Sequence, residues 1–148
     1  MYVYKACSNF RKRAIAFRVY TNQHNMGLSE NHIVWNFMDM VIYAMKLIMP
    51  KVIFVFDRCF ADEKLMKYMN HFDSDYIIRV PKNCGIVGLE YKGKLSLFDH
   101  LGYFKDVCYH IREQIKVNLL SAKNPSDGYD PFFAVSNVDD SLGLLYSR

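Results

Sequence analysis

Several features are scarce or missing in this 148-residue sequence. With seven Gly, four Pro and 51% apolar residues, it fits neither a collagen-like repeat nor a disordered chain, and its composition suits one globular domain. No run of about 18 uncharged apolar residues occurs, so we expect no membrane-spanning segment. Lys5 and the basic residues 11–13 interrupt the apolar stretch near the N-terminus, which therefore does not match a secretory signal.

Motifs of several common sites are also missing. The four cysteines form no C-x-x-C pair, which excludes the usual zinc motifs and a dense disulfide framework. We therefore expect reduced thiols and a cytoplasmic protein. No phosphate-binding P-loop, nucleophile elbow or dinucleotide fingerprint is present, and the five His residues show no metal-binding spacing.

The net charge of +4 is unevenly distributed along the chain. Residues 1–60 carry eight Lys or Arg against three acidic residues, whereas residues 61–148 carry eleven against twelve. The basic N-terminal part, with Arg11, Lys12 and Arg13 at its centre, is typical of a surface that contacts phosphates. Basic residues that protect a strand edge from aggregation are an alternative interpretation.

The first fifty residues predict a hairpin followed by a long helix. Met1–Cys7 and Ala14–Tyr20 are rich in β-branched and aromatic residues, and the polar segment between them predicts the turn. After a loop, Ser29 is a suitable N-cap, and apolar residues then recur with a period of 3.6 until Pro50.

The middle of the chain predicts a parallel strand–helix–strand unit. Val52–Phe56 is an uninterrupted apolar run, which favours a strand buried on both faces. A helix is expected from its N-cap Asp62 to about Asn70, with Leu65, Met66 and Met69 buried, and a second strand over Tyr76–Val80.

From Asn83 onward the pattern favours strands. We expect a hairpin over Gly85–Phe98 that turns at residues 92–94, and a strand over Val107–Leu119, for which a helix is an alternative. Beyond these we expect an exposed loop over Ser121–Pro131, a strand over Phe132–Asn137, and a helix that begins at Asp139 or Asp140.

Asp57 is the strongest candidate for chemistry. It follows a predicted strand directly, and the carboxyl ends of strands are where an open α/β sheet collects ligands and catalytic groups. A carboxylate held there suits Mg²⁺ or Mn²⁺, which prefer oxygen ligands. Two alternatives remain open: Asp57 caps the following turn, or it pairs with Arg58 or another neighbour.

Segments along most of the chain resemble, in the same order, the catalytic domain of DDE-type insertion-sequence transposases. Lys51-Val-Ile-Phe-Val-Phe-Asp57-Arg58-Cys59-Phe60 is similar to the family's strand that ends in Asp-Arg-Gly-Phe, with Cys59 in place of Gly. Tyr76-Ile-Ile-Arg79-Val80, followed by Lys82 and Asn83, is similar to the next strand. The outer segments with a family counterpart are 13–17, 132–137 and 144–148.

The resemblance implies an RNase H-like fold, in which helices flank a mixed five-stranded sheet, with an additional β-rich segment at about residues 85–120. In that family two Asp and one Glu hold two Mg²⁺ or Mn²⁺ ions, which promote cleavage and strand transfer at transposon ends. Asp57 would be the second carboxylate, and double-stranded DNA the partner. The DNA-contacting residues would be Arg58, Arg79, Lys82 and the basic run Arg11, Lys12 and Arg13. The location would be the bacterial cytosol or nucleoid.

The other two carboxylates of the family pattern have no clear match. Only Glu30 and Asp39 precede Asp57, both in the predicted long helix, and the strand that should pair with Val52–Phe56 is not found. We therefore expect residues 1–148 to form a single, partial catalytic domain that is inactive alone and of low stability.

Two other functions remain open at this point. The chain could be a non-catalytic DNA-binding or assembly module that keeps the fold, with a homodimer as one arrangement. A metal-dependent nuclease that uses Asp57 with Asp99 or Asp127 is a weaker alternative.

Overall fold

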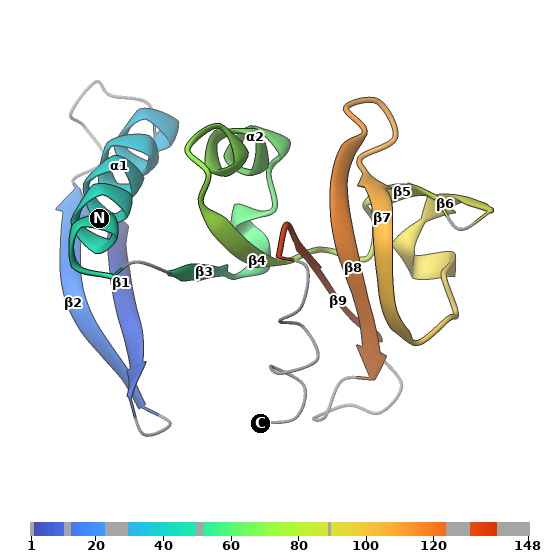
Figure 1. The fold of residues 1–148 in the computed structure, drawn as a ribbon, viewed down its shortest axis with the longest axis horizontal. Helices are drawn as coiled ribbons and strands as arrows, with labels where there is room; N and C mark the ends of the chain where they lie inside the picture. Colours follow the sequence, from blue (N-terminus) through green and yellow to red (C-terminus); the bar gives the residue numbers. More distant parts are fainter. Residues whose placement is uncertain are drawn as a thin grey trace. The chain divides into compact units, whose positions relative to one another are not determined.

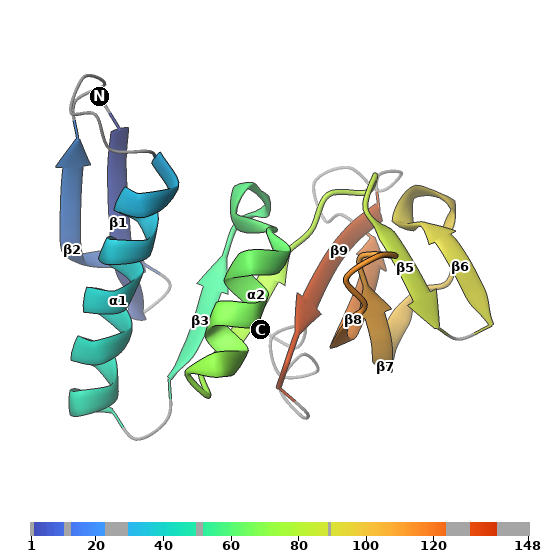
Figure 2. The same cartoon turned by 90° about the horizontal axis from the view of Figure 1, so that it is seen from above.

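The computed structural model describes residues 2–10, 13–22, 30–49, 52–88, 90–123 and 131–138, with side chains from residue 33 onward. Its contacts divide the chain into two compact units, residues 1–52 and residues 53–148. Figures 1 and 2 show the ribbon in two views.

Unit 1 holds the predicted hairpin and helix. β1 (Tyr2–Phe10) pairs antiparallel with β2 (Arg13–Asn22), and both strands are longer than predicted. α1 spans Glu30–Ile48 and ends before Pro50, as predicted. The loop predicted over Thr21–Leu28 begins later than expected, because Thr21 and Asn22 belong to β2. Residues 23–28 and the predicted N-cap Ser29 lie outside the described residues.

The helix α1 lies alongside the hairpin in both views (Figures 1 and 2). Its buried side chains recur every three or four residues, namely Ile33, Phe37, Met38, Val41 and Ile42. Tyr43 and Leu47 are exposed on another face. Among the residues described here, no helix has the length and apolar character needed to cross a membrane.

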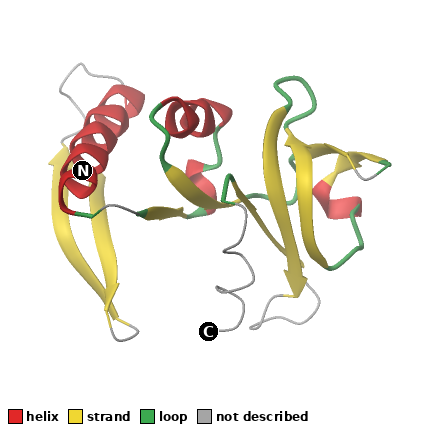
Figure 3. Cartoon of the chain, in the orientation of Figure 1, coloured by secondary structure: helices red, strands yellow, loops and turns green. Residues whose placement is uncertain are grey.

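Unit 2 is built on a seven-stranded mixed sheet with the order β3-β4-β9-β8-β7-β5-β6. The bounds are Ile53–Phe56 for β3, Asp75–Arg79 for β4, Gly85–Gly88 for β5, Tyr91–Lys94 for β6, Gly102–Tyr109 for β7, Ile115–Lys123 for β8 and Pro131–Ser136 for β9. β3 and β4 are parallel, and the other neighbouring pairs are antiparallel. The chain is thus an α/β protein with a mixed sheet, as Figure 3 shows.

The predicted strand–helix–strand unit is confirmed. β3 leads through the short 3-10 helix η1 (Arg58–Phe60) into α2 (Glu63–His71) and then into β4. Asp62 is the N-cap of α2 because its carboxylate accepts a hydrogen bond from the backbone N–H of Lys64 at 2.9 Å. The three side chains predicted to be buried on α2 are buried, Met66 and Met69 completely.

One face of the sheet forms the core beneath α2. On β4, Tyr76 and Ile78 are fully buried, and the pairing places Val135 of β9 opposite Ile78. Leu119 of β8 lies opposite Val135, so buried side chains continue across three strands on this face. The other face carries Ile77 and Ala134, with half-buried side chains packed against them.

The prediction that Val52–Phe56 is buried on both faces is wrong. β3 lies at the edge of the sheet and pairs with β4 alone among the described residues, and its Val55 side chain is 70% exposed. An apolar run shows that a segment prefers β structure, but it does not show how many neighbours the strand will find.

The predicted turn at residues 92–94 is also wrong. β5 ends at Gly88, which pairs with Tyr91 at the start of β6, so the Lys-Gly-Lys segment lies inside β6. Gly88 and Glu90 have positive φ angles of 144° and 60°, which provide the reversal. Gly93 instead makes room for the Tyr91 side chain, since a Cβ at residue 93 would lie 2.7 Å from the Tyr91 hydroxyl oxygen.

The single strand predicted over Val107–Leu119 is two strands, β7 and β8. The turn between them spans residues 110–114, where His110 and Gln114 take positive φ angles of 65° and 48°. The predicted exposed loop begins later than expected, because Ser121 and Ala122 are buried in β8.

Two further elements complete the described part of unit 2. The last strand is confirmed as β9, which starts one residue earlier than predicted. η2 (Leu95–Leu97) follows β6 and was not predicted. The helix predicted to begin at Asp139 or Asp140 lies outside the described residues.

Candidate functional site

The carboxylate of Asp57 is the first side chain beyond β3. Its backbone is extended (φ −77°, ψ 168°), and its carbonyl oxygen accepts a hydrogen bond from the backbone N–H of Phe60 at 3.0 Å. The side chain makes no capping hydrogen bond and is 64% exposed. The backbone therefore closes the turn, and the carboxylate faces solvent.

Arg79 lies beside Asp57 because of the parallel pairing. Phe56 is opposite Ile78 in the register of β3 and β4, so the next residue of each strand, Asp57 or Arg79, falls at the same carboxyl edge. A guanidinium nitrogen of Arg79 is 4.0 Å from a carboxylate oxygen of Asp57. The partner of Asp57 is thus Arg79, on the neighbouring strand.

An aromatic ring supports Arg79 from a third strand. The guanidinium carbon lies 5.1 Å from the ring centroid of Phe132, on β9. A guanidinium stacks well on an aromatic face because it is planar and weakly hydrated. The carboxylate, the guanidinium and the ring, from β3, β4 and β9, form what we call the edge site.

The ion pair between Arg79 and Asp57 is weak enough for Arg79 to exchange Asp57 for another anion. The Arg79 side chain is 43% exposed and its separation from Asp57 is at the limit of an ion pair, so this contact adds little to stability. A guanidinium held loosely in this way is available to a phosphate, with which it can form two parallel hydrogen bonds.

Two other predicted site residues, Arg58 and Lys82, lie in the segments that follow β3 and β4. Arg58 is exposed in η1, and Lys82 is exposed in the turn before β5, where its carbonyl oxygen accepts a hydrogen bond from the Ser96 N–H at 2.7 Å. Arg13 is the first residue of β2, in the other unit, and its side chain is outside the described part. Arg11 and Lys12 lie outside the described residues altogether.

The acidic residues do not form a metal site in the described part of the chain. Nowhere in it do three His, Cys, Asp or Glu side chains gather as a metal would require. Glu30 and Asp39 both lie in α1, as the sequence indicated. Asp99 lies in the loop after η2 and contacts His100 at 3.7 Å, and Asp127 is outside the described residues. One carboxylate with a cation beside it does not fit a two-metal centre.

Sequence reasoning missed one contributor at this edge of the sheet, Phe132, and one at the opposite end of β4, Asn137. Phe132 was predicted only as a strand residue, because its approach to Arg79 depends on the pairing of β4 with β9, more than 50 residues apart in the chain. Asn137 is predicted from the sequence only as the last residue of the strand Phe132–Asn137. Its side chain accepts a hydrogen bond from the Tyr76 N–H at 2.8 Å and donates to the Ser74 carbonyl and to Asn70.

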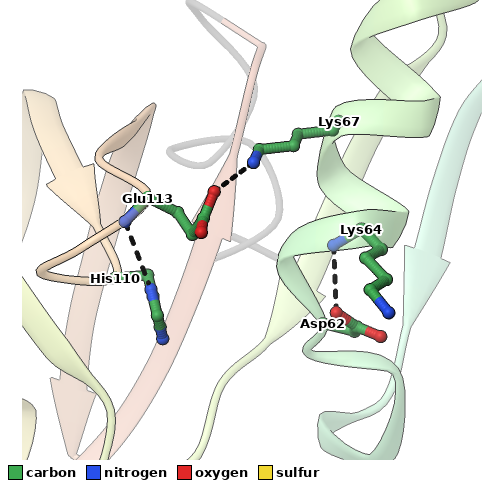
Figure 4. Close-up of polar contacts among 5 residues, drawn as sticks. All are labelled: Asp62, Lys64, Lys67, His110 and Glu113. Atoms are coloured by element: carbon green, nitrogen blue, oxygen red, sulfur yellow. Dashed lines mark hydrogen bonds and ion pairs between the residues drawn. The ribbon is translucent and has the colours of Figure 1, made fainter.

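A second polar cluster joins α2 to the turn between β7 and β8 (Figure 4). Lys67 reaches from the helix to the Glu113 carboxylate, and the hydrogen bond from Lys67 lowers the pKa of that carboxyl group below its usual value. The Glu113 N–H donates to Nδ1 of His110 at 3.4 Å. Since Lys67 and Glu113 are exposed, their ion pair fixes the turn more than it stabilises the fold.

Comparison of the chain with protein-family models, with curated proteins and with solved structures gives no match. The fold and the site therefore define a class in structural terms, an α/β protein whose mixed sheet presents a carboxylate and a guanidinium at the carboxyl ends of two parallel strands.

Proposed function

We propose that this chain belongs to the DDE-type transposases, that it binds double-stranded DNA at transposon ends, and that Asp57 stands at the position of the second catalytic carboxylate. The observation that carries the proposal is the edge site itself. Asp57 and Arg79, two residues matched to the family motifs, lie 4.0 Å apart at the carboxyl ends of two adjacent parallel strands.

An RNase H-like arrangement is part of the proposal. It is supported by the β3–α2–β4 unit with Asp57 immediately after its first strand. It is also supported by the edge position of β3 among the described residues, because the resemblance expects one more strand beside this one. The strands β5 to β8 would be the additional β-rich segment of the fold.

DNA binding would be carried by basic residues at this edge of the sheet. Arg79 would turn from Asp57 to a phosphate, and Arg58 and Lys82 would add contacts from the neighbouring turns. Arg11, Lys12 and Arg13 would supply a second basic segment from the hairpin. These contacts neutralise phosphates and release counterions, so they give affinity without sequence specificity.

Metal-dependent cleavage would need more ligands than this edge offers. Asp57 can supply oxygen ligands to Mg²⁺ or Mn²⁺, and two such ions would activate the attacking oxygen and stabilise the leaving one in the family's chemistry. The other two carboxylates have no counterpart among the described residues. We therefore expect DNA binding without cleavage from this chain alone.

Duplex DNA binding tests the proposal. The full chain should bind a labelled duplex in fluorescence anisotropy at low salt, and Arg79→Ala should weaken binding about three- to tenfold and lower the salt slope by about 1. Arg112→Ala is a matched control. Arg112 is also an Arg and is exposed, but it precedes β8, which runs in the same direction as β4, so it lies at the opposite end of the sheet.

The two outcomes against the proposal are distinct. No binding to duplex DNA at low salt would contradict DNA binding, and equal losses for Arg79→Ala and Arg112→Ala would contradict the edge site. Robust plasmid nicking by this chain with Mn²⁺, removed by Asp57→Asn, would keep the family assignment and overturn the expected inactivity.

A non-catalytic DNA-binding or assembly module is the second candidate. The observation that favours it is the contact of Asp57 with a cation, which suits a structural ion pair as well as a former metal ligand. In such a module, Mn²⁺ would not alter the affinity for DNA. If Asp57 binds a metal ion instead, the affinity for DNA should change when Mn²⁺ is added, and Asp57→Asn should abolish that change.

A further inference from the structure

One face of the strands β5 to β8 is buried. Ile86 of β5 and Val107 and Tyr109 of β7 are at most 1% exposed. Val117 of β8 lies opposite Val107 and is also buried. Because successive side chains alternate along a strand, the residues before and after these lie on the opposite face of the sheet. Three lysines lie on that opposite face.

These three residues, which we call the lysine face, are Lys92 and Lys94 of β6 and Lys116 of β8. The strand pairing sets one row across four strands, which runs Lys92, Val87, Cys108, Lys116. Three strand spacings separate the ends of this row, a distance of about 14 Å. The lysines are exposed, whereas the shorter side chains between them are half-buried. Long cationic side chains therefore stand on both sides of shorter ones.

The position of Lys116 distinguishes this face from a protected edge. β6 is an edge strand, and lysines on such a strand keep it from pairing with other molecules. β8 instead lies between β9 and β7, so Lys116 has no edge to protect. Its ion pair with Asp106 at 2.9 Å is weak, because the two side chains are 73% and 69% exposed. What the three lysines share is a face of the sheet.

We propose that the lysine face binds the phosphate backbone of duplex DNA. This inference rests on the proposed function, to which it adds a second contact surface. Arg79 of β4 lies opposite Ala134, and Ala134 lies opposite Leu120 of β8. Because Leu120 and Lys116 are four residues apart on one strand, Arg79 and the lysines belong to the same face of the sheet.

Charge and spacing favour DNA as the partner. Residues 1–52 carry seven Lys or Arg against two acidic residues, so that unit offers the lysines no complementary charge. Side chains about 14 Å apart can reach phosphates on both sides of a major groove, which is about 12 Å wide. A membrane surface would need exposed apolar side chains beside the lysines, but Val87 and Cys108 are half-buried.

Fluorescence anisotropy of the full chain with a labelled duplex tests the lysine face. The double variant Lys92→Glu/Lys94→Glu should weaken binding about tenfold or more and lower the salt slope by about 2, because each phosphate contact contributes about 1. Glutamate also keeps the edge of β6 charged, so the variant stays protected against self-association. Circular dichroism verifies that it is folded.

Lys64→Glu/Lys123→Glu is the matched control. Both lysines are exposed, Lys64 on α2 and Lys123 on the α2 side of β8, since it alternates with Leu119 and Ser121. The control changes the net charge equally and keeps the lysine face, so screening should limit its effect on affinity to about twofold.

A third variant acts in the opposite direction. Asp106→Asn removes the carboxylate beside Lys116, and Asn tolerates the positive φ of 58° at this position. The released lysine and the lost repulsion should tighten duplex binding about twofold. An unchanged or weaker affinity would contradict a role for Lys116.

Three further results would overturn the inference. One is an equal loss of affinity in Lys92→Glu/Lys94→Glu and in the control. Another is a lysine-face variant that keeps its duplex affinity and loses binding to phosphatidylserine vesicles, which would make the partner a membrane. The third is the absence of duplex binding by the natural chain, which would overturn the proposed function as well. In the first two cases a weakened Arg79→Ala would leave the proposed function intact.

Discussion

At the residue scale, the environment of Tyr76 makes the sharpest prediction about stability. Its ring is fully buried under α2, and in the described part of the chain its hydroxyl makes no hydrogen bond of normal geometry. Burial raises the pKa of Tyr76 to about 12, and the nearby Asn70 side chain offsets only part of that rise. This hydroxyl is therefore desolvated with little compensation.

Replacing Tyr76 with Phe should not destabilise the protein. The change removes an unsatisfied buried hydroxyl and keeps the ring, so the free energy of unfolding should stay equal or rise by about 1 kcal/mol in urea titrations at pH 7. A loss of more than about 1 kcal/mol would mean that the hydroxyl has an essential partner.

The same residue makes stability depend on alkaline pH. The folded pKa of about 12 lies above the unfolded value of 10, so between these values the unfolded chain releases a proton that the folded chain keeps, and stability falls as pH rises. At pH 11 this amounts to about 1.4 kcal/mol. Tyr76→Phe should lose that much less stability than the natural chain between pH 9 and pH 11, and identical pH profiles would contradict the assignment.

At the element scale, Asn137 holds the end of β9 against the start of β4. Its amide accepts from the Tyr76 N–H at 2.8 Å and donates to the Ser74 carbonyl at 3.0 Å and to Asn70 at 3.1 Å. Ser136 adds a bond of 2.7 Å to the Tyr76 carbonyl. These bonds satisfy backbone groups where the antiparallel pairing ends.

Asn137→Ala should therefore cost about 2–3 kcal/mol, because it leaves a buried N–H and carbonyl without partners. Denaturant unfolding gives this value directly. Asn83→Ala, at an exposed turn position, is the control and should change stability by less than about 0.5 kcal/mol. If both variants have equal stability, the amide of Asn137 does not link the two strands.

The sequence allowed the helices and the parallel unit to be predicted because their signals are local. The N-cap Asp62 and the buried positions of α2 follow from capping and a period of 3.6. Asp57 and Arg79 could be expected at one edge as soon as β3 and β4 were predicted to be parallel. The chain reversals at Glu90 and at residues 110–114 could not be predicted, because Glu90, His110 and Gln114 take positive φ angles without being Gly.

The other wrong or missing predictions concern contacts that depend on which distant strands pair in the sheet. β3 was expected in the sheet interior, but its position depends on which strands pair with it, and an apolar run carries no such information. The contact of Phe132 with Arg79 depends in the same way on β9 lying beside β4.

At the scale of the whole molecule, charge connects the fold with the proposed function. The net charge of +4 derives from residues 1–60, and the edge site begins where that basic part ends. Asp57 is an acidic residue at this edge, and it lies beside the guanidinium proposed to meet DNA. We therefore predict that Asp57 opposes DNA binding when no metal is present.

The most direct test measures the duplex affinity of Asp57→Asn in EDTA. Removing this charge should tighten binding about threefold, because Arg79 is released and a repulsion is lost. In an Arg79→Ala background the gain should be smaller, since only the repulsion remains. An affinity that is unchanged or weaker in Asp57→Asn would contradict the central claim that the edge site of Asp57 and Arg79 faces DNA.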